Sequence, residues 1–334
     1  MCGISGLFDT RGRRDFDGAL MHRINDSLHH RGPDEGSIHL QPGLAFGHRR
    51  LSIIDIATGQ QPLFNADHSV GIVFNGEIYN YRELTAELTA LGYRFQTKSD
   101  TEAIVHAWSA WGEDCVQKLR GMFAFVIWDK ARDQLFMARD RLGVKPMFYG
   151  LLDDGTLVFG SELKALLAHP GMKRDIVPQA VEEYFALGYV AEPRTIFRQA
   201  LKLPPAHTLV IKRGEPLGQP RRYWDVNFTT DSRIDEVQAQ EELTRRLREA
   251  VKLRLISEVP LSRWFRGPLR QRVRSSLLGG PLADSGMFDL KTVGQMVEQH
   301  ENGSRDHSTP LWTLLMYDAF LRNVMGATSM REAA

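Results

Sequence analysis

The cysteine at position 2 has the clearest chemical potential of any residue in this sequence. Removal of Met1 would leave Cys2 with a free α-amine beside its own thiol, and Gly3 follows directly. A free α-amine has a pKa of about 7.7–8.0 and a thiol lies only modestly higher, so a small environmental shift gives a thiolate or a proton-accepting amine. One residue would then supply both nucleophile and base. The alternative is a buried cysteine in an N-terminal strand.

Three polar clusters at the ends of apolar runs carry the groups that amide hydrolysis needs. They span residues 31–36, 47–55 and 75–80. The Asn75 side chain and the backbone N–H of Gly76 can stabilise the oxyanion that forms when a carbonyl is attacked. Glycine permits the close approach that such a site demands. For an isolated Asn-Gly pair, the alternative is a hairpin turn.

Two charged residues can recognise a free amino acid. Arg50 offers a planar fork for an α-carboxylate, and Asp100 can accept hydrogen bonds from an α-ammonium group. The alternatives are a surface charge for Arg50 and a helix cap for Asp100.

The remaining chemically active residues are interpreted as structural. Cys115 follows a predicted helix without a nearby activating partner, which indicates packing. The spacing of four histidines fits no ligand pattern, so we expect no metal site. These are His22, His29, His30 and His48.

The elements that must position these residues alternate between strands and helices. Short apolar runs at 70–74, 122–128, 134–138 and 157–159 predict buried strands. Helical spacing predicts one helix through Leu84, Leu88 and Leu91, and another through Ile104 and Trp108 after a cap at Ser99 or Asp100. Short turns at 129–133 and 153–156 favour antiparallel pairing. The predicted class is therefore α+β, with helices layered on antiparallel sheet.

The second part of the chain is helical and short. A Pro- and Gly-rich stretch within 188–220 marks a domain boundary. A charged helix at about 235–256 carries the apolar stripe Leu243, Leu247, Val251 and Leu255. Two more helices are predicted at 293–300 and 311–321, and Leu278-Gly279-Gly280-Pro281 is predicted to be a turn. About 75 residues remain after the charged helix, too few for a large catalytic domain.

Composition narrows the partners and the compartment. The 334 residues contain 42 Lys plus Arg against 41 Asp plus Glu, so no broad positive field would attract nucleic acid or an anionic membrane. No apolar run reaches the length of a membrane span, and the N-terminus lacks a signal peptide. Two cysteines suit a reducing compartment. We expect a cytoplasmic protein.

Six motifs in consistent order resemble the glutaminase domain of glutamine-hydrolysing asparagine synthetases, which are class II amidotransferases. They are Cys2-Gly3-Ile4, Arg31-Gly32-Pro33-Asp34, Arg50-Leu51-Ser52-Ile53, Asn75-Gly76-Glu77-Ile78-Tyr79-Asn80, Ser99-Asp100-Thr101-Glu102 and Arg139-Asp140-Arg141-Leu142-Gly143-Val144-Lys145-Pro146. The resemblance implies the N-terminal nucleophile hydrolase fold, a four-layer αββα sandwich, and L-glutamine as substrate. It implies catalysis by Cys2, Asn75 and Gly76 without a cofactor. The implied substrate contacts are Arg50, Leu51, Ser52, Ile53, Ile54, Asn75, Gly76, Glu77 and Asp100.

The resembled family also has a synthetase domain of the ATP-pyrophosphatase type, which uses ATP and Mg²⁺ to convert aspartate to asparagine. Its Ser-Gly-Gly-x-Asp-Ser phosphate loop does not occur in this sequence. Residues 256–261 resemble the segment before that loop, whereas the residues from 262 onward resemble the far C-terminal end of the family. We therefore expect an internal deletion near 259–262. The predicted parts are a glutaminase domain at 1–210, a linker with the first synthetase helix at 211–261, and a helical remnant at 262–334.

The leading hypothesis is a glutaminase that releases glutamate and ammonia but has lost ATP-dependent asparagine synthesis. One alternative is a catalytically silent, truncated amidotransferase that acts as a binding or scaffold protein. Another is an amidotransferase for exopolysaccharide biosynthesis. A sugar-isomerase or phosphoribosyl acceptor domain is disfavoured because the tail resembles neither. The alternatives for a protein partner are a second copy in a homodimer and a separate acceptor chain.

Overall fold

The structure is a computed structural model that describes residues 2–52, 55, 58–229, 235–254, 261–267 and 269–322. The chain divides into two compact units, residues 1–256 and 257–334. The domain limits predicted at 210 and 261 stay predictions.

Two six-stranded sheets, antiparallel in every pairing, form the centre of the first unit. In spatial order, one sheet contains β10 (Leu201–Lys202), β8 (Phe148–Leu151), β9 (Thr156–Gly160), β1 (Gly3–Asp9), β3 (Leu44–Arg50) and β2 (Glu35–Gln41). The other contains β12 (Arg221–Arg222), β11 (His207–Lys212), β7 (Gln134–Arg139), β6 (Gly121–Asp129), β5 (Val70–Ile78) and β4 (Leu63–Phe64). The four predicted strands and both predicted hairpins are confirmed in β5, β6, β7 and β9.

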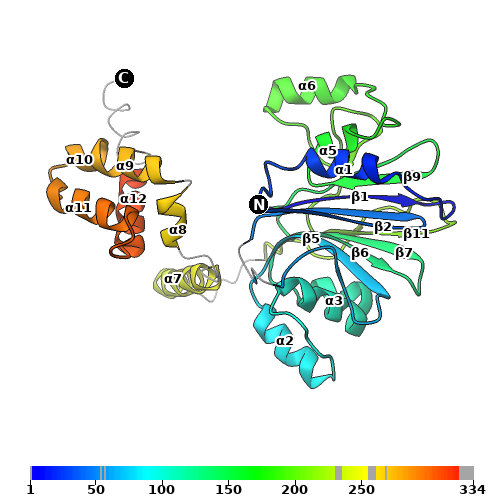
Figure 1. The fold of residues 1–334 in the computed structure, drawn as a ribbon, viewed down its shortest axis with the longest axis horizontal. Helices are drawn as coiled ribbons and strands as arrows, with labels where there is room; N and C mark the ends of the chain where they lie inside the picture. The colour runs from blue at the N-terminus through cyan, green and yellow to red at the C-terminus, as the bar shows by residue number, and fades with distance from the viewer. Residues whose placement is uncertain are drawn as a thin grey trace. The chain divides into compact units, whose positions relative to one another are not determined.

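Helices cover the outer face of each sheet (Figure 1). On the first sheet lie α1 (Gly18–Asp26) and α5 (Leu163–Leu167), and on the second lie α2 (Tyr81–Ala90) and α3 (Asp100–Trp111). Side chains from both sheets, among them Phe46 and Val126, meet in a core between them. The expected four-layer αββα sandwich is therefore confirmed.

The helix α3 illustrates how the sequence builds this frame. Ser99, one of the two predicted caps, is its N-cap. The Ser99 hydroxyl accepts a hydrogen bond from the N–H of Thr101 at 3.1 Å. Residues 100–108 are all buried, and the indole N–H of Trp108 donates to Asp129 Oδ2 at 2.9 Å. Packing and capping together fix the start of α3 against the second sheet, where Asp100 lies.

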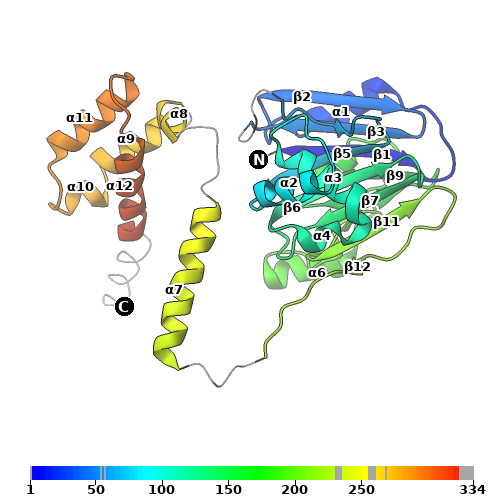
Figure 2. The ribbon, with the colours of Figure 1, turned by 90° about the horizontal axis from the view of Figure 1, so that it is seen from below.

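Further helices complete the first unit, and its last helix has no buried residue. They are η1 (Gly112–Asp114), α4 (Cys115–Lys118) and α6 (Pro178–Leu187). The helix α7 (Glu236–Leu253) is uninterrupted (Figure 2) and confirms the predicted charged helix. Leu243, Leu247 and Val251 of its apolar stripe are all more than half exposed, whereas Leu255 lies outside the described residues.

The second unit contains five described helices, of which the sequence predicted the last two. They are α8 (Leu261–Arg266), α9 (Arg270–Leu278), α10 (Pro281–Asp284), α11 (Leu290–Glu301) and α12 (Ser308–Phe320). They share a core that includes Phe265, Val273, Leu277 and Val297. Gly279 and Gly280 form the predicted change of direction between α9 and α10, and Pro281 is the first residue of α10. Among the helices described in either unit, none combines the length and the apolar character of a membrane span.

Candidate functional site

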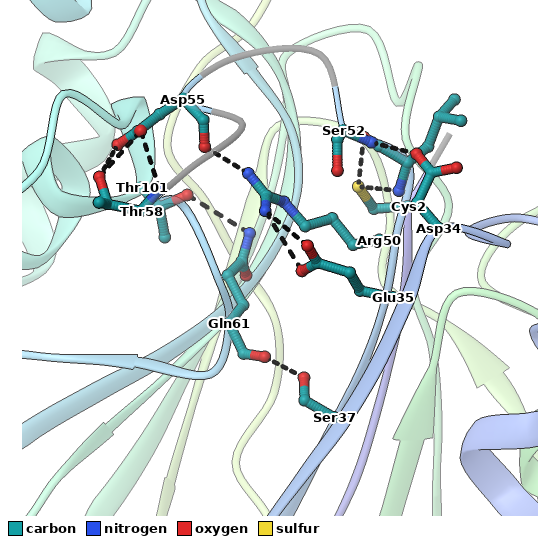
Figure 3. A network of polar contacts seen from close by, with 11 residues as sticks. Cys2, Asp34, Glu35, Ser37, Arg50, Ser52, Asp55, Thr58, Gln61 and Thr101 are labelled. Carbon is teal, nitrogen blue, oxygen red and sulfur yellow. Dashed lines mark hydrogen bonds and ion pairs between the residues drawn. The ribbon is translucent and has the colours of Figure 1, made fainter.

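Cys2 is held at the start of β1, a central strand of the first sheet. Its thiol lies against the backbone of Leu51, whose N–H donates to Sγ at 3.4 Å (Figure 3). Arg31 donates from Nε to the Cys2 carbonyl at 2.9 Å and from Nη1 to Glu162 at 2.9 Å. Arg31 therefore holds the backbone of Cys2 directly before the paired strand, while Leu51 contacts its thiol.

A cavity of about 220 Å³ opens beside this thiol, a size that suits a single amino acid. Six of the nine substrate contacts implied by the sequence line it together with the catalytic Cys2. The cavity is lined by Cys2, Arg50, Leu51, Asn75, Gly76, Glu77 and Asp100, with further residues between them. Ser52 does not line it, because its N–H turns to Asp34 Oδ2 at 2.8 Å. Ile53 and Ile54 lie outside the described residues.

Asn75 and Gly76 occupy the middle of β5 and not a hairpin turn. Asn75 is buried, and its Nδ2 has no hydrogen-bond partner among the residues that the structure describes. An unpaired buried amide costs free energy unless a ligand uses it. Asn75 Nδ2 is thus a donor available to a molecule in the cavity.

The N–H of Gly76 points to the same side of β5. The N–H groups of Phe74 and Ile78 donate to Gln61 Oε1 at 2.6 Å and to Asp100 Oδ2 at 2.9 Å, away from β6. Because N–H directions alternate along a strand, the N–H of Gly76, midway between them, faces the cavity side. A Cβ on Gly76 would strike the carbonyl of Met122, so this close backbone approach requires glycine.

Two carboxyl groups share the cavity, and both resist ionisation. Burial raises the pKa of Asp100 to about 7, and the neighbouring charge of Glu77 adds to the shift. Burial also raises the pKa of Glu77, while the ammonium of Lys145 opposes it. Buried groups that titrate near neutral pH are typical of functional sites.

Arg50 also lines the cavity, and its guanidinium already has partners. Its side chain is almost fully buried, with Nη1 3.2 Å from Glu35 Oε2 and Nη2 2.5 Å from the carbonyl of Asp55 (Figure 3). A substrate carboxylate would therefore have to share this guanidinium with Glu35.

The two thiols differ in access. Burial raises the pKa of the Cys2 thiol, although the Leu51 N–H partly offsets this. Cys115 is fully buried in the core against α3, which accords with its interpretation as a packing residue, and burial raises its pKa further. His48 is buried as well, and burial lowers its pKa to about 3 while it contacts the carbonyl of Phe74.

Sequence reasoning missed three residues that shape the site. Gln61 links the N–H of Phe74 to Thr101, Arg31 holds Cys2, and Lys145 lines the cavity. Hydrophobic periodicity does not identify these residues, because each acts through contacts with residues distant in sequence. The only indication in the sequence was that Arg31 and Lys145 belong to two of the six motifs.

Comparisons with known proteins match both parts of the chain. The family model described as a glutamine amidotransferase domain matches residues 1–224, and one described as asparagine synthase matches residues 241–322. Glutamine-hydrolyzing asparagine synthetase 3 of Bacillus subtilis is 38% identical over 308 residues, covering 90% of this chain and 49% of the relative. Asparagine synthetase 1 of the same organism is 36% identical over 276 residues, covering 80% and 42%. The chain thus spans about half the length of these curated relatives.

Among solved structures, a glutamine phosphoribosylpyrophosphate amidotransferase from B. subtilis aligns with 67% of this chain and 49% of its own. The identity is 21% and the TM-score 0.47.

Proposed function

The chain belongs to the glutamine amidotransferase domain family, and we propose that it hydrolyses L-glutamine to L-glutamate and ammonia with Cys2 as the nucleophile. The supporting observation is the cavity in which the Cys2 thiol, the unpaired Nδ2 of Asn75 and the two carboxyl groups of Glu77 and Asp100 converge.

In this proposal the free α-amine of Cys2 takes the thiol proton as Sγ attacks the side-chain carbonyl of glutamine. The carbonyl oxygen becomes an oxyanion, which Asn75 Nδ2 and the Gly76 N–H stabilise by hydrogen bonds. Collapse of this intermediate breaks the C–N bond, and the α-amine returns its proton so that ammonia leaves. Water then attacks the resulting thioester, which releases glutamate and restores the thiol.

Both charged groups of L-glutamine are on its α-carbon, and the cavity contains a group of opposite charge for each of them. Arg50 supplies a guanidinium for the α-carboxylate, and Asp100 with Glu77 supplies acceptors for the α-ammonium. The glutaminase step uses no cofactor, since a thiol, an amine and fixed hydrogen-bond donors suffice.

The test is glutamate release from L-glutamine by the purified chain, compared with Cys2→Ala. Mass spectrometry of the N-terminus establishes whether Met1 has been removed, because the base is absent while Met1 remains. Release that is missing from the Met1-free protein, or that Cys2→Ala leaves unchanged, contradicts the proposal and favours a binding or scaffold role.

For the second reaction of the family, we propose that this chain has lost the ATP and Mg²⁺ site through an internal deletion near 259–262. The residues present do not fit a phosphate loop. Gly279 and Gly280 are followed by Pro281, which has no N–H to offer a phosphate.

The acceptor of the ammonia is then outside the chain, either a separate acceptor protein or solvent. Addition of ATP, Mg²⁺ and aspartate should give no asparagine, and asparagine formation by this chain alone would refute the proposed loss. The same assay, with amino-sugar products measured, tests the alternative of a sugar acceptor, as in exopolysaccharide biosynthesis. Sedimentation analysis distinguishes a homodimer from a monomer.

A further inference from the structure

Lys145 is a buried cation at the proposed glutaminase site whose charge the mechanism above does not use. Lys145 is only 4% exposed, and it lines the same cavity as Cys2, Glu77 and Asp100. Lysine is almost never fully buried without charged neighbours, because its desolvation is costly. Something in the surrounding structure must therefore hold it there.

The loop after β7 provides that support through Asp140. Its Oδ2 accepts from the Lys145 N–H at 2.9 Å, and its Oδ1 accepts from the N–H groups of Leu142 and Val144 at 3.1 and 3.0 Å. Gly143 takes the left-handed conformation, with φ of +66°, at the bend. Arg139 Nε donates to the Lys145 carbonyl at 2.8 Å. The backbone is clamped on both sides of Lys145, so its side chain is committed to the cavity.

Four charged or titratable groups on four elements surround this ammonium. Burial lowers the pKa of Lys145, while Glu77 on β5, Cys2 at β1 and Asp140 after β7 favour its charged form and Arg31 after α1 opposes it. In return, the Lys145 charge is the largest effect that opposes the burial of Glu77.

Further charged groups act on the thiol, among them Arg50 and Asp100. Arg50 favours a thiolate at Cys2, whereas Asp100 disfavours it. Asp100 is thus a carboxyl group of this cavity that disfavours negative charge on sulfur, and Lys145 places a cation in the same cavity.

We infer that Lys145 is a positioning residue of the glutaminase site, whose ammonium stabilises negative charge on Cys2 Sγ and keeps Glu77 ionised to receive the substrate's α-ammonium. This inference rests on the proposed function but concerns a property of the free protein. The consequence is that the charge at position 145, and not its bulk, sets the reactivity of the thiol.

The experiment measures alkylation of Cys2 by iodoacetamide as a function of pH, with the modified peptide identified by mass spectrometry. Cys115 is fully buried, so Cys2 is the thiol that reacts in the folded protein. The variants are Lys145→Met, Lys145→Gln and Lys145→Arg, with Lys130→Met as the matched control at an exposed lysine in the β6–β7 turn. Circular dichroism confirms that each variant is folded.

Loss of the charge in Lys145→Met should move the midpoint of the alkylation profile up by about one pH unit, equivalent to a tenfold slower reaction near neutral pH. Lys145→Gln should behave alike, which keeps the test valid if the Met variant does not fold. Lys145→Arg and Lys130→Met should retain the wild-type midpoint. A profile that is unchanged in both uncharged variants overturns the inference.

Steady-state kinetics supply the second readout. Loss of the ionised Glu77 should raise KM for glutamine in Lys145→Met, and Lys145→Arg should restore it, whereas a purely structural role would not distinguish the two. If the wild-type chain releases no glutamate but the alkylation midpoints shift as expected, the proposed function fails and the inference about the Cys2 environment stands.

Discussion

The two compact units differ in whether their buried polar groups have partners. In the described part of the second unit, the two carboxylates with buried side chains are both paired: Arg270 and Arg274 lie against Glu301, and Arg322 lies against Asp318. In the first unit, the cavity at Cys2 keeps Asn75 Nδ2 without a described partner and Asp100 with a pKa raised to about 7. The difference indicates that buried charged groups stabilise the second unit through ion pairs, whereas the first unit has polar groups available to bind a ligand.

The same contrast extends to how the helices are held. Residues 100–108 of α3 are buried without interruption, whereas the first unit's last helix, α7, has no buried residue. Substitutions should therefore separate three kinds of position: those that hold a unit together, those that serve the cavity, and those that face solvent.

The largest effect is expected in the core of the second unit. Phe265→Ala removes a fully buried aromatic ring and should destabilise this unit by about 3–5 kcal/mol. Hydrogen exchange should show lost protection in α9 and α11 with β1 and β5 unchanged. Trp264→Ala, at an exposed neighbour, is the control. Equal loss of protection in both units would mean that they are not independent.

The next effect should appear in kcat without a cost in stability. Asn75→Ala removes the proposed oxyanion donor and should lower kcat by about 10²–10³-fold, while the melting temperature is kept because Nδ2 had no described partner. The comparison variant is Asn25→Ala, whose Nδ2 donates to the carbonyls of Ser37 and His48. It should lose about 1–3 kcal/mol of stability and little activity. The reverse pattern would make Asn75 structural.

Asp100 should give the cavity a pH dependence of known sign. Its folded pKa of about 7 lies above the unfolded value of about 3.9, so the native state binds the extra proton between them. The free energy of unfolding should therefore fall as pH rises from about 4 to 7, by at most roughly 4 kcal/mol. Glutamine binding should strengthen about tenfold from pH 6 to 8 as the carboxylate forms.

Urea unfolding and KM measured across this pH range test the expectation, with Asp100→Asn as reference. The asparagine variant should lose the additional slope in stability together with the pH dependence of KM. A wild-type slope that persists in Asp100→Asn would assign it to other carboxyl groups.

The smallest effect is expected on α7. Leu247→Ala, on the exposed stripe, should change stability by less than about 0.5 kcal/mol. Leu88→Ala, at a fully buried leucine of α2, should cost about 2–5 kcal/mol when measured in the same way. A large cost at Leu247 would mean that another surface covers this stripe in solution.

Local patterns predicted the layers of the first unit because its elements follow strong rules. Ser99 is a good cap, Trp108 continues a buried helix face, and β6 is a continuous apolar run. The helix α9 was not predicted because only Val273 and Leu277 of its nine residues are buried. The other positions are mostly arginine and serine, so the apolar periodicity of this segment is weak. The motif residues could be named from sequence, but their meeting in one cavity depends on pairing between distant strands.

Two properties of the site could not be predicted from local sequence patterns. The engagement of Arg50 with Glu35 arises because β2 and β3 pair these residues directly. The burial of Lys145 depends on a turn organised by Asp140, although a lysine in a loop would ordinarily be taken as exposed.

The position of β1 also bears on how the chain is made. One neighbour of β1 is β3, at residues 44–50, but the other is β9, at residues 156–160. At a synthesis rate of about 5–20 residues per second, roughly 8–30 s pass before the second neighbour has been translated. Until then β1 has a single sheet neighbour, and its second edge is unpaired. Pairing with β9 fills that edge and completes the centre of the first sheet.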